Sequence, residues 1–484
     1  MEAPRDGLTL FGPLEEQPVH GIKAGVVGRP KGIERFRTWV HRIQNPIVPD
    51  EPKLDRLTFP GFEAVFNASW EEKPVVEISI SPDELDETIR IADGHQRVYR
   101  TVSLYSEKIK KSILRDDASP DVWFVVVPDE LYNYCRPQSR VEKDVQVETD
   151  INLNKEKAKE LKKNPSLFER DNEAAKEYDY HNDFHDQLKA RLLEDQAVLQ
   201  IAKERTLTPE DFAEYHPRDD QNRFRAEVAW NLGTATYYKA GGRPWKTAEV
   251  RDDVCYVGLV FKRDERREDP RAACCGAQMF LDSGDGVVFK GAVGPWYNPD
   301  RGQYHLTEDG AEDLMDLVIE GYKRITNTDK PPRELFIHGR VRFNDEEWGG
   351  FENGINEETD LTGVRIIDGK FIKLFRPTDY TVLRGLAYPK NNKKEGYLWT
   401  KGFIPKTQTY PGREVPNPLF IDICRGEADI VTVMKDIMAL TKLNYNTTNF
   451  AHGEPVTLKF ADSIGEIMTA GPVDIPLLPF RYYI

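Results

Sequence analysis

Several signals are missing from this chain of 484 residues, and each absence excludes a class of protein. No stretch approaches the run of about 20 apolar residues that is needed to span a bilayer. The first residues lack a basic segment followed by an apolar one, so no secretory signal is visible. The five cysteines form no C-x-x-C pair, which fits reduced thiols better than a disulfide or zinc framework. We therefore expect a soluble, cytoplasmic protein that does not engage a membrane.

Motifs of the common catalytic and nucleotide-binding sites are missing as well. The chain contains no G-x-x-x-x-G-K-[ST], G-x-G-x-x-G, G-x-S-x-G or H-E-x-x-H. The nine histidines are dispersed, apart from His181 and His185, and such a pair more often lies at the surface than at a metal. The net charge of −15 argues against nucleic-acid binding through the whole surface, but not against a basic channel inside an acidic protein.

The first half of the chain alternates between strand and helix signals. Apolar runs over residues 22–28, 121–128 and 197–203 predict buried parallel strands. Apolar residues at helical spacing over 33–43, and the sequence of 185–195, predict helices between them. This alternation indicates a parallel sheet that is covered on both faces.

A change of composition interrupts that pattern between residues 140 and 180. This stretch is dense in charges of both signs and poor in large apolar residues. We interpret it as a solvated insertion with one helix, not as part of a core.

The second half of the chain begins after Trp245 with a different order of elements. Residues 254–263 predict a strand, and 276–294 predict a hairpin around a Gly-Asp-Gly turn. Residues 313–325 predict an amphipathic helix and 334–343 a further strand. Hairpin, helix and parallel strand in this order suit a mixed α/β sheet.

Four polar residues form a candidate anion site. His185 and Lys189 are four residues apart on a predicted helix and share a face. Gln200 lies in the next predicted strand, and Lys239 precedes the Gly-Gly pair of "YYKAGGRPW". Cations and an amide donor that converge near the start of a helix suit a terminal phosphate. From spacing alone, solvent-facing side chains on a long helix remain the alternative.

Four segments resemble Argonaute proteins. Residues 22–36 resemble the first strand and helix of the MID domain, and "YYKAGGRPW" resembles the segment that joins MID to PIWI. Residues 397–426 and 440–467 are similar to the C-terminal half of PIWI, with its Leu-Asn-Tyr-Asn, Pro-Val-Thr-Leu and Ala-Asp runs in family order. The remaining length holds no N or PAZ domain, so the resemblance is to short prokaryotic Argonautes that consist of MID and PIWI.

The resemblance implies a fold class and a domain organisation. The fold is expected to be α/β, with a Rossmann-like MID domain followed by an RNase H-like PIWI domain. The MID domain would occupy residues 1–245, including an N-terminal segment and the charged insertion near 140–180. The PIWI domain would occupy residues 246–484.

The resemblance also implies what the candidate anion site binds. In this family MID holds the 5′-phosphate of a guide strand, and the positions carried over are His185, Lys189, Gln200 and Lys239. A magnesium ion is often bound there by guide phosphates and the C-terminal carboxylate, which would be that of Ile484. Core packing of the apolar tail is a compatible interpretation, because packing would position that carboxylate.

Active PIWI domains cut their target with a tetrad of carboxylates that holds two metal ions. The first tetrad position corresponds to Val260, which cannot bind a metal, and the second to Arg340, which brings a positive charge. Asp462 occupies the last position, but one carboxylate cannot hold two metal ions. Three acidic residues near these strands are offset and are expected to face solvent: Asp264, Asp345 and Glu346.

The predicted protein is therefore a catalytically inactive Argonaute that binds a 5′-phosphorylated guide, expected to be RNA, and recognises complementary single-stranded DNA. The resemblance implies a partner subunit with an APAZ domain fused to an effector that consumes NAD, sirtuin-like as first choice and TIR as second. Depletion of NAD by that partner would defend the cell against plasmids or phages. Alternatives are an active guide-directed nuclease, a partner that is a nuclease, and a structural subunit that has lost guide binding.

Overall fold

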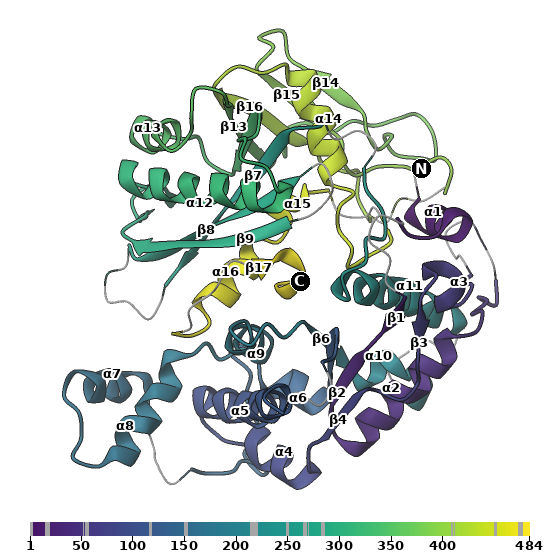
Figure 1. Cartoon of the computed structure of the whole chain (residues 1–484), viewed down its shortest axis with the longest axis vertical. Helices are drawn as coiled ribbons and strands as arrows, with labels where there is room; N and C mark the ends of the chain where they lie inside the picture. The colour runs from purple at the N-terminus through teal and green to yellow at the C-terminus, as the bar shows by residue number, and fades with distance from the viewer. Residues whose placement is uncertain are drawn as a thin grey trace.

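A computed structural model shows a chain built around two large sheets, one in each half (Figure 1). It describes residues 3–14, 20–51, 53, 58–115, 119–149, 153–212, 221–247, 251–264, 269, 271–281, 286–407, 410, 412–449, 453–472 and 478–484. The α/β class predicted from the sequence is confirmed, while the domain boundary between residues 245 and 246 stays a prediction. Among the described helices, none combines the length and apolarity needed to cross a bilayer.

Four parallel strands form the sheet of the N-terminal half, in the order β4-β2-β5-β6. They are β2 (Ala24–Gly28), β4 (Val76–Ser79), β5 (Val122–Val127) and β6 (Leu199–Lys203). Every residue of β2 and β5 is buried, as their apolar runs predict. The strand expected over 22–28 is split, because the short β1 (Gly21–Ile22) pairs with β3 (Ser69–Trp70) instead.

Helices cover both faces of this sheet. On one face, α2 (Pro30–Ile43) and α11 (Gln221–Lys239) pack through a core rich in aromatic side chains. On the other face lie α5 (Gly94–Ile113) and α9 (Phe184–Leu192). Alternate residues of β5 belong to the two cores, which explains why its sequence is apolar without interruption. The helices predicted over 33–43 and 185–195 are thus confirmed, with small differences at their ends.

The charged insertion holds two helices where one was expected. They are α7 (Lys155–Lys163) and α8 (Glu169–Lys176), and Figure 1 shows them at the periphery of the N-terminal half. Their small common core consists of Ala158, Ala175 and Tyr178. A search for large apolar residues overlooks a core made mostly of alanine, which is why the second helix was missed.

Nine strands form the sheet of the C-terminal half, in the order β14-β15-β16-β13-β12-β7-β8-β9-β17. Strands β7, β8 and β9 are antiparallel, whereas β12 lies parallel to β7, so the predicted hairpin and parallel strand are confirmed. The turn between β8 and β9, at 282–285, lies outside the described residues. The strands are β7 (Val254–Arg263), β8 (Ala273–Leu281), β9 (Gly286–Gly294), β12 (Glu334–Gly339), β13 (Asp360–Asp368), β14 (Ala387–Pro389), β15 (Glu395–Leu398), β16 (Leu419–Arg425) and β17 (Leu478–Pro479).

One face of this sheet packs on α12 (Glu308–Thr326) and α13 (Asp345–Asn353). The helix predicted over 313–325 is therefore confirmed. The buried side of the helix runs through Leu314, Val318 and Tyr322, whereas Leu317 is exposed.

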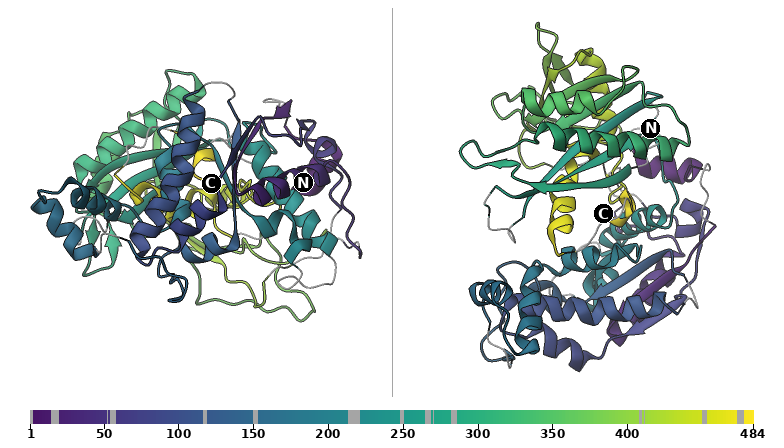
Figure 2. Two further views of the ribbon diagram at one scale, coloured as in Figure 1. Left: turned by 90° about the horizontal axis from the view of Figure 1, so that it is seen from below. Right: turned by 60° about the vertical axis from the view of Figure 1, so that its left-hand side comes forward.

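The opposite face of the large sheet carries three helices and the end of the chain. The helices are α14 (Ile430–Leu440), α15 (Val456–Lys459) and α16 (Ala461–Thr469). The backbone of α15 lies so close to β7 that a Cβ on Gly258 would stand 1.8 Å from the carbonyl oxygen of Thr457. Figure 2 shows the chain's end and α16 between the two halves. The C-terminal residues thus reach the N-terminal sheet, where the candidate site lies.

Candidate functional site

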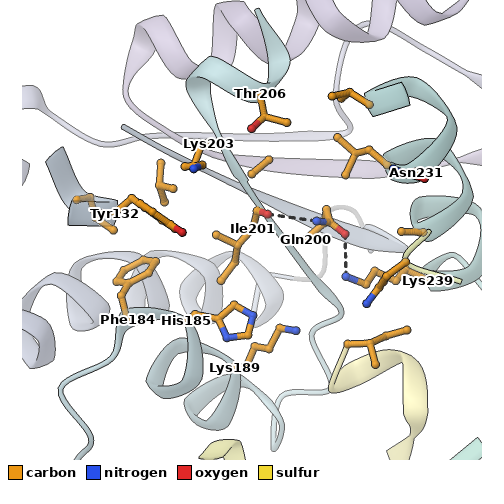
Figure 3. A pocket seen from close by; sticks show the side chains of 18 of the residues that line it. Tyr132, Phe184, His185, Lys189, Gln200, Ile201, Lys203, Thr206, Asn231 and Lys239 are labelled. Carbon is orange, nitrogen blue, oxygen red and sulfur yellow. Dashed lines mark hydrogen bonds between the residues drawn. The ribbon is translucent and has the colours of Figure 1, made fainter. Parts of the chain in front are cut away.

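A cavity of about 730 Å³ opens beside β6, between α9, α11 and the end of the chain (Figure 3). The structure brings all five residues of the predicted guide-end site together in its lining: His185, Lys189, Gln200, Lys239 and Ile484. They come from α9, β6, α11 and the C-terminal tail. Their roles stay predictions, but their convergence is a feature of the fold.

Lys239 is held against the edge of the N-terminal sheet. Its side chain is buried, with 3% of the residue exposed. Its Nζ donates hydrogen bonds to the carbonyl oxygen of Leu199 at 2.9 Å and to Oε1 of Gln200 at 2.8 Å. Gln200 in turn donates from Nε2 to the carbonyl oxygen of Ile201 at 3.2 Å. Lys239 and Gln200 therefore form one rigid polar pair in the cavity wall.

The Gly-Gly pair explains how Lys239 reaches this position. Helix α11 ends at Lys239, and Gly241 then adopts a φ of +100°, which favours glycine. Gly242 lies against the ring of Tyr237, where a Cβ would come within 2.3 Å. The tight turn ends the helix beside β6 and fixes the lysine at its last position.

Lys189 is the second buried cation of the cavity. The residue is 4% exposed, and its Nζ donates a hydrogen bond to the carbonyl oxygen of Tyr483 at 3.0 Å. Burial lowers the pKa of Lys189 to about 8. Burial and the nearby charge of Lys189 also lower the pKa of Lys239 well below its ordinary value. Two ammonium groups thus repel each other in a poorly solvated place, and a bound anion would relieve that cost.

His185 is exposed to the cavity, and its Nδ1 lies 2.8 Å from Oδ1 of Asp186. Desolvation by the cavity walls and the charge of Lys189 lower the pKa of His185, so the imidazole is neutral at pH 7. Its Nδ1–H then donates to Asp186, which leaves Nε2 as an acceptor. An anion in the cavity would raise the pKa and favour the imidazolium, which donates from both nitrogens. The sequence analysis did not identify Asp186, because its contact with the ring of His185 depends on how that ring is oriented in the structure.

Other polar side chains line the same cavity. Arg136 and Lys203 lie over the ring of Tyr132, at 3.6 and 4.0 Å from its centre. No motif marked these three residues in the sequence. Asn446 also lines the cavity, and it is the last residue of the Leu-Asn-Tyr-Asn run, which could have identified it. In a chain with a net charge of −15, this cavity gathers four side-chain cations, namely Arg136, Lys189, Lys203 and Lys239.

The three predicted tetrad positions lie in the C-terminal half, in β7, directly after β12 and in the first turn of α16. Val260 is completely buried in the core beneath α16. Arg340 directly follows β12 and is half exposed, and its NH2 lies 3.4 Å from Oε1 of Glu454 and 3.9 Å from Oδ2 of Asp462. The Asp462 side chain is 85% exposed. An ion pair with arginine therefore stands where the resemblance places metal-binding carboxylates.

The three offset acidic residues divide into two kinds. Asp345 and Glu346 are exposed, as expected. The expectation for Asp264 was wrong, because this residue is buried. Its backbone amide donates to the carbonyl oxygen of Ala272 at 3.0 Å, which extends the pairing of β7 and β8 by one residue.

Comparison with solved structures shows which known proteins have a similar fold. Clostridium butyricum Argonaute bound to a guide DNA and a 19-mer target DNA matches 100% of this chain and 52% of that chain, at 14% identity and a TM-score of 0.60. Aa-Ago with externally bound siRNA matches 100% and 53%, at 16% identity and 0.54. Aquifex aeolicus Argonaute matches 99% and 54%, at 15% identity and 0.51. No protein-family model and no curated protein matches the sequence.

The chain therefore has the fold of the MID and PIWI domains of Argonaute proteins, as the sequence predicted. It spans about half the length of the Argonautes that it matches.

Proposed function

We propose that this chain binds the 5′-phosphate end of a short guide strand in the cavity beside β6. The observation that carries the proposal is the pair of buried lysines, Lys189 and Lys239. An ammonium group has three donor hydrogens. Toward described residues, Lys239 uses two and Lys189 uses one, so three hydrogens remain for a ligand. A phosphate dianion suits them because it accepts several charge-assisted hydrogen bonds at once.

Direct binding tests this function. The purified chain is titrated with labelled guides of one sequence, as RNA and as DNA, each with a 5′-phosphate or a 5′-hydroxyl. We expect the phosphorylated RNA guide to bind most tightly. Complementary single-stranded DNA should then bind only to the guide-loaded protein, since base pairing would supply its sequence specificity. A structural subunit without guide binding, the alternative, predicts no preference among the four guides.

Magnesium is proposed as a cofactor at the guide end, following the resemblance. The donor chemistry fits, because magnesium is usually held by one or two carboxylates together with substrate phosphates. Ile484 lines the cavity, and the hydrogen bond from Lys189 to Tyr483 holds the tail there. The neighbouring lysines oppose a lone cation, so we expect magnesium to bind only with the guide. A glycine added after Ile484 should then weaken guide binding in magnesium but not in EDTA.

We propose that the PIWI fold of this chain does not cleave its target. Burial of Val260 and the ion pairs of Arg340 support this, because they leave no cluster of carboxylates at the tetrad positions among the described residues. An active nuclease with carboxylates from offset positions is the rival. The burial of Asp264 in the β7–β8 region is the one observation that favours it. Incubation of the loaded protein with target and magnesium or manganese separates the two.

The response to a matched target is proposed to come from a partner with an APAZ domain and an NAD-consuming effector. The chain spans about half of the Argonautes that it matches, so a second chain could supply the rest. Exposed apolar side chains suit such a contact: Phe371 is 97% and Phe375 77% exposed, in the segment that leads from β13 to β14, the edge strand of the large sheet. Our first choice is a sirtuin-like effector, then TIR, then a nuclease. The role would be defence against plasmids or phages.

Co-expression with the partner tests this assembly. We expect a heterodimer that depletes NAD only with guide and matching single-stranded DNA. Phe371→Ser with Phe375→Ser should weaken copurification. Phe168→Ser, at an exposed phenylalanine of the charged insertion, is the matched control and should not. Degradation of DNA with NAD left intact would assign a nuclease effector instead.

A further inference from the structure

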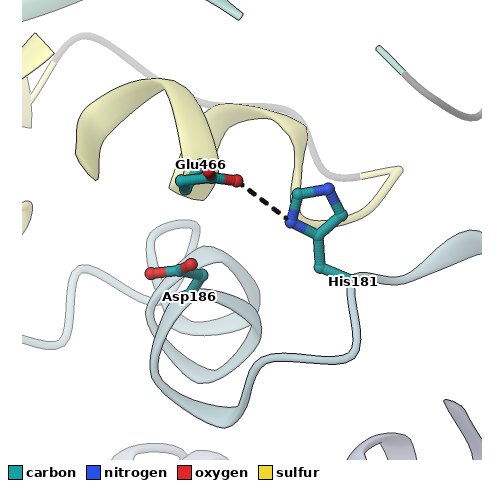
Figure 4. A group of neighbouring side chains, drawn as sticks. All are labelled: His181, Asp186 and Glu466. Atoms are coloured by element: carbon teal, nitrogen blue, oxygen red, sulfur yellow. Dashed lines mark ion pairs between the residues drawn. The ribbon is translucent and has the colours of Figure 1, made fainter. Parts of the chain in front are cut away.

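A histidine and two carboxylates meet where the two halves of the chain touch (Figure 4). His181 lies in the segment before α9, Asp186 lies in the first turn of α9, and Glu466 lies in α16. One ligand atom from each lies within 4.8 Å of the others, and Nδ1 of His181 is 3.5 Å from Oε2 of Glu466. We propose that these side chains bind a zinc ion that joins α9 to α16.

The backbone around the three side chains is fixed. The amide of His181 donates to the carbonyl oxygen of Ala470 at 2.8 Å, and Nε2 of Gln187 donates to the carbonyl oxygen of His181 at 2.7 Å. The amide of Asp186 donates to Oδ1 of Asp183, which caps α9. Ligands held in place by their surroundings bind a metal with less loss of conformational freedom.

The charges of the group favour a cation. One carboxylate oxygen of Asp186 and one of Glu466 lie within 4.8 Å of each other, so two negative groups face one another here. The histidines and lysines that face Asp186 are His181, His185, Lys189 and Lys262, and Nδ1 of His185 lies 2.8 Å from Oδ1 of Asp186. Lys262 pairs with Oε1 of Glu466, which leaves Oε2 toward His181. A divalent ion bound between Asp186 and Glu466 would neutralise both carboxylates.

The donor set indicates zinc. Imidazole nitrogen and carboxylate oxygen are both zinc ligands, and a water molecule would complete a four-coordinate site with these three side chains. Magnesium prefers oxygen donors alone, so the histidine separates this site from the magnesium proposed at the guide end. None of the three side chains lines the cavity, and the inference does not depend on guide binding. A second group, formed by Asp183, His185 and Asp186, is less suitable because Asp183 is engaged in capping α9.

The whole chain, freed of any tag and dialysed against a chelator, is titrated with Zn²⁺ by calorimetry and with Co²⁺ by visible absorption. We expect one equivalent of Zn²⁺ to bind, and tetrahedral Co²⁺ bands to appear. His181→Ala and the isosteric Glu466→Gln should each weaken binding by at least about tenfold to a hundredfold, the loss typical when only a residue that supports a ligand is removed. The control is His41→Ala, which removes an exposed histidine paired with Glu72 but with no third ligand. It should bind zinc as the wild type does.

Circular dichroism and the thermal midpoint without metal establish that each variant is folded. Added Zn²⁺ should raise the thermal midpoint of the wild type and of His41→Ala, but not of Glu466→Gln. Absence of one-equivalent binding to the folded wild type would overturn the inference. Unchanged binding in both folded ligand variants would do so as well, because the zinc would then be held elsewhere.

Discussion

Replacement of Lys189 by methionine would separate binding of a phosphate from a structural role of this lysine. Methionine keeps the unbranched apolar stem and removes the charge. Burial holds the pKa of Lys189 near 8, against an ordinary value of 10.5, which corresponds to a cost of about 3 kcal/mol for the charged form. The lost hydrogen bond to Tyr483 offsets about 1–3 kcal/mol of that. We therefore expect the free energy of unfolding of the guide-free variant to be unchanged or higher by up to about 2 kcal/mol.

Guide binding should change in the opposite direction. Lys189 has two donor hydrogens that no described residue accepts. A charge-assisted hydrogen bond contributes about 1.5–3 kcal/mol. Loss of one such bond should therefore lower the affinity for a phosphorylated guide about tenfold to a hundredfold. The double variant Lys189→Met with Lys239→Met should lower this affinity at least about a hundredfold. Binding of a guide with a 5′-hydroxyl should barely change, since it offers no dianion.

The assay is equilibrium binding of the two guides at one fixed salt concentration, because backbone contacts depend strongly on salt. Lys203→Met is the matched control, since Lys203 lines the same cavity but lies over Tyr132, away from the buried pair. It should affect both guides equally. Equal losses for both guides in Lys189→Met, or a large loss of stability without guide, would refute a phosphate site at this lysine.

Three further predictions concern the C-terminal half. The guide-loaded protein should leave its target intact. Val260→Asp alone should not restore cutting, because Arg340 remains. Guide-directed cleavage products on a gel would contradict this prediction. Gly258→Ala should lower the free energy of unfolding in urea by about 3 kcal/mol, because α15 must move, whereas Gly349→Ala in α13 should not lower it. His338 is buried against Thr457, and burial lowers its pKa to about 3. Between pH 7 and pH 5 the histidine takes up a proton in the unfolded chain but not in the folded chain. The free energy of unfolding of the wild type should therefore fall by about 2 kcal/mol more than that of His338→Gln over this range.

Local patterns in the sequence predicted several central strands and helices of both sheets, because burial imposes a period on them. The uninterrupted apolar run of β5 and the helical spacing of α2 were sufficient for this reason. The same reasoning failed where burial leaves a weak pattern. Alanines form the small core under α7 and α8, and Asp264 is buried although its neighbours in sequence are charged. Such cases depend on what packs on a residue, which its immediate neighbours do not reveal.

In the candidate site, too, some features could be predicted from the sequence and others could not. Lys189 and Lys239 could be named from spacing and resemblance, but their burial and their partners could not. The contact of Lys239 with Gln200 requires the end of α11 to meet β6, and the contact of Lys189 requires the chain to return to Tyr483. Glu466 had no signal at all, since its neighbours His181 and Asp186 lie in the other half of the chain.

Helix α16 lies between the two proposed features of this protein. Asp462, in its first turn, faces Arg340, the residue at the second predicted tetrad position. The other end of the helix contacts the segment of His181 and α9, which carries Lys189 and His185 into the cavity. Arg340 faces the first end of α16 and Val260 lies beside Gly465 in its middle, so the predicted tetrad positions are separated from the end that contacts the segment of His181. A chain that binds a guide without cutting the target requires this separation, and a guide bound to the buried lysines would also stabilise the junction that both halves build.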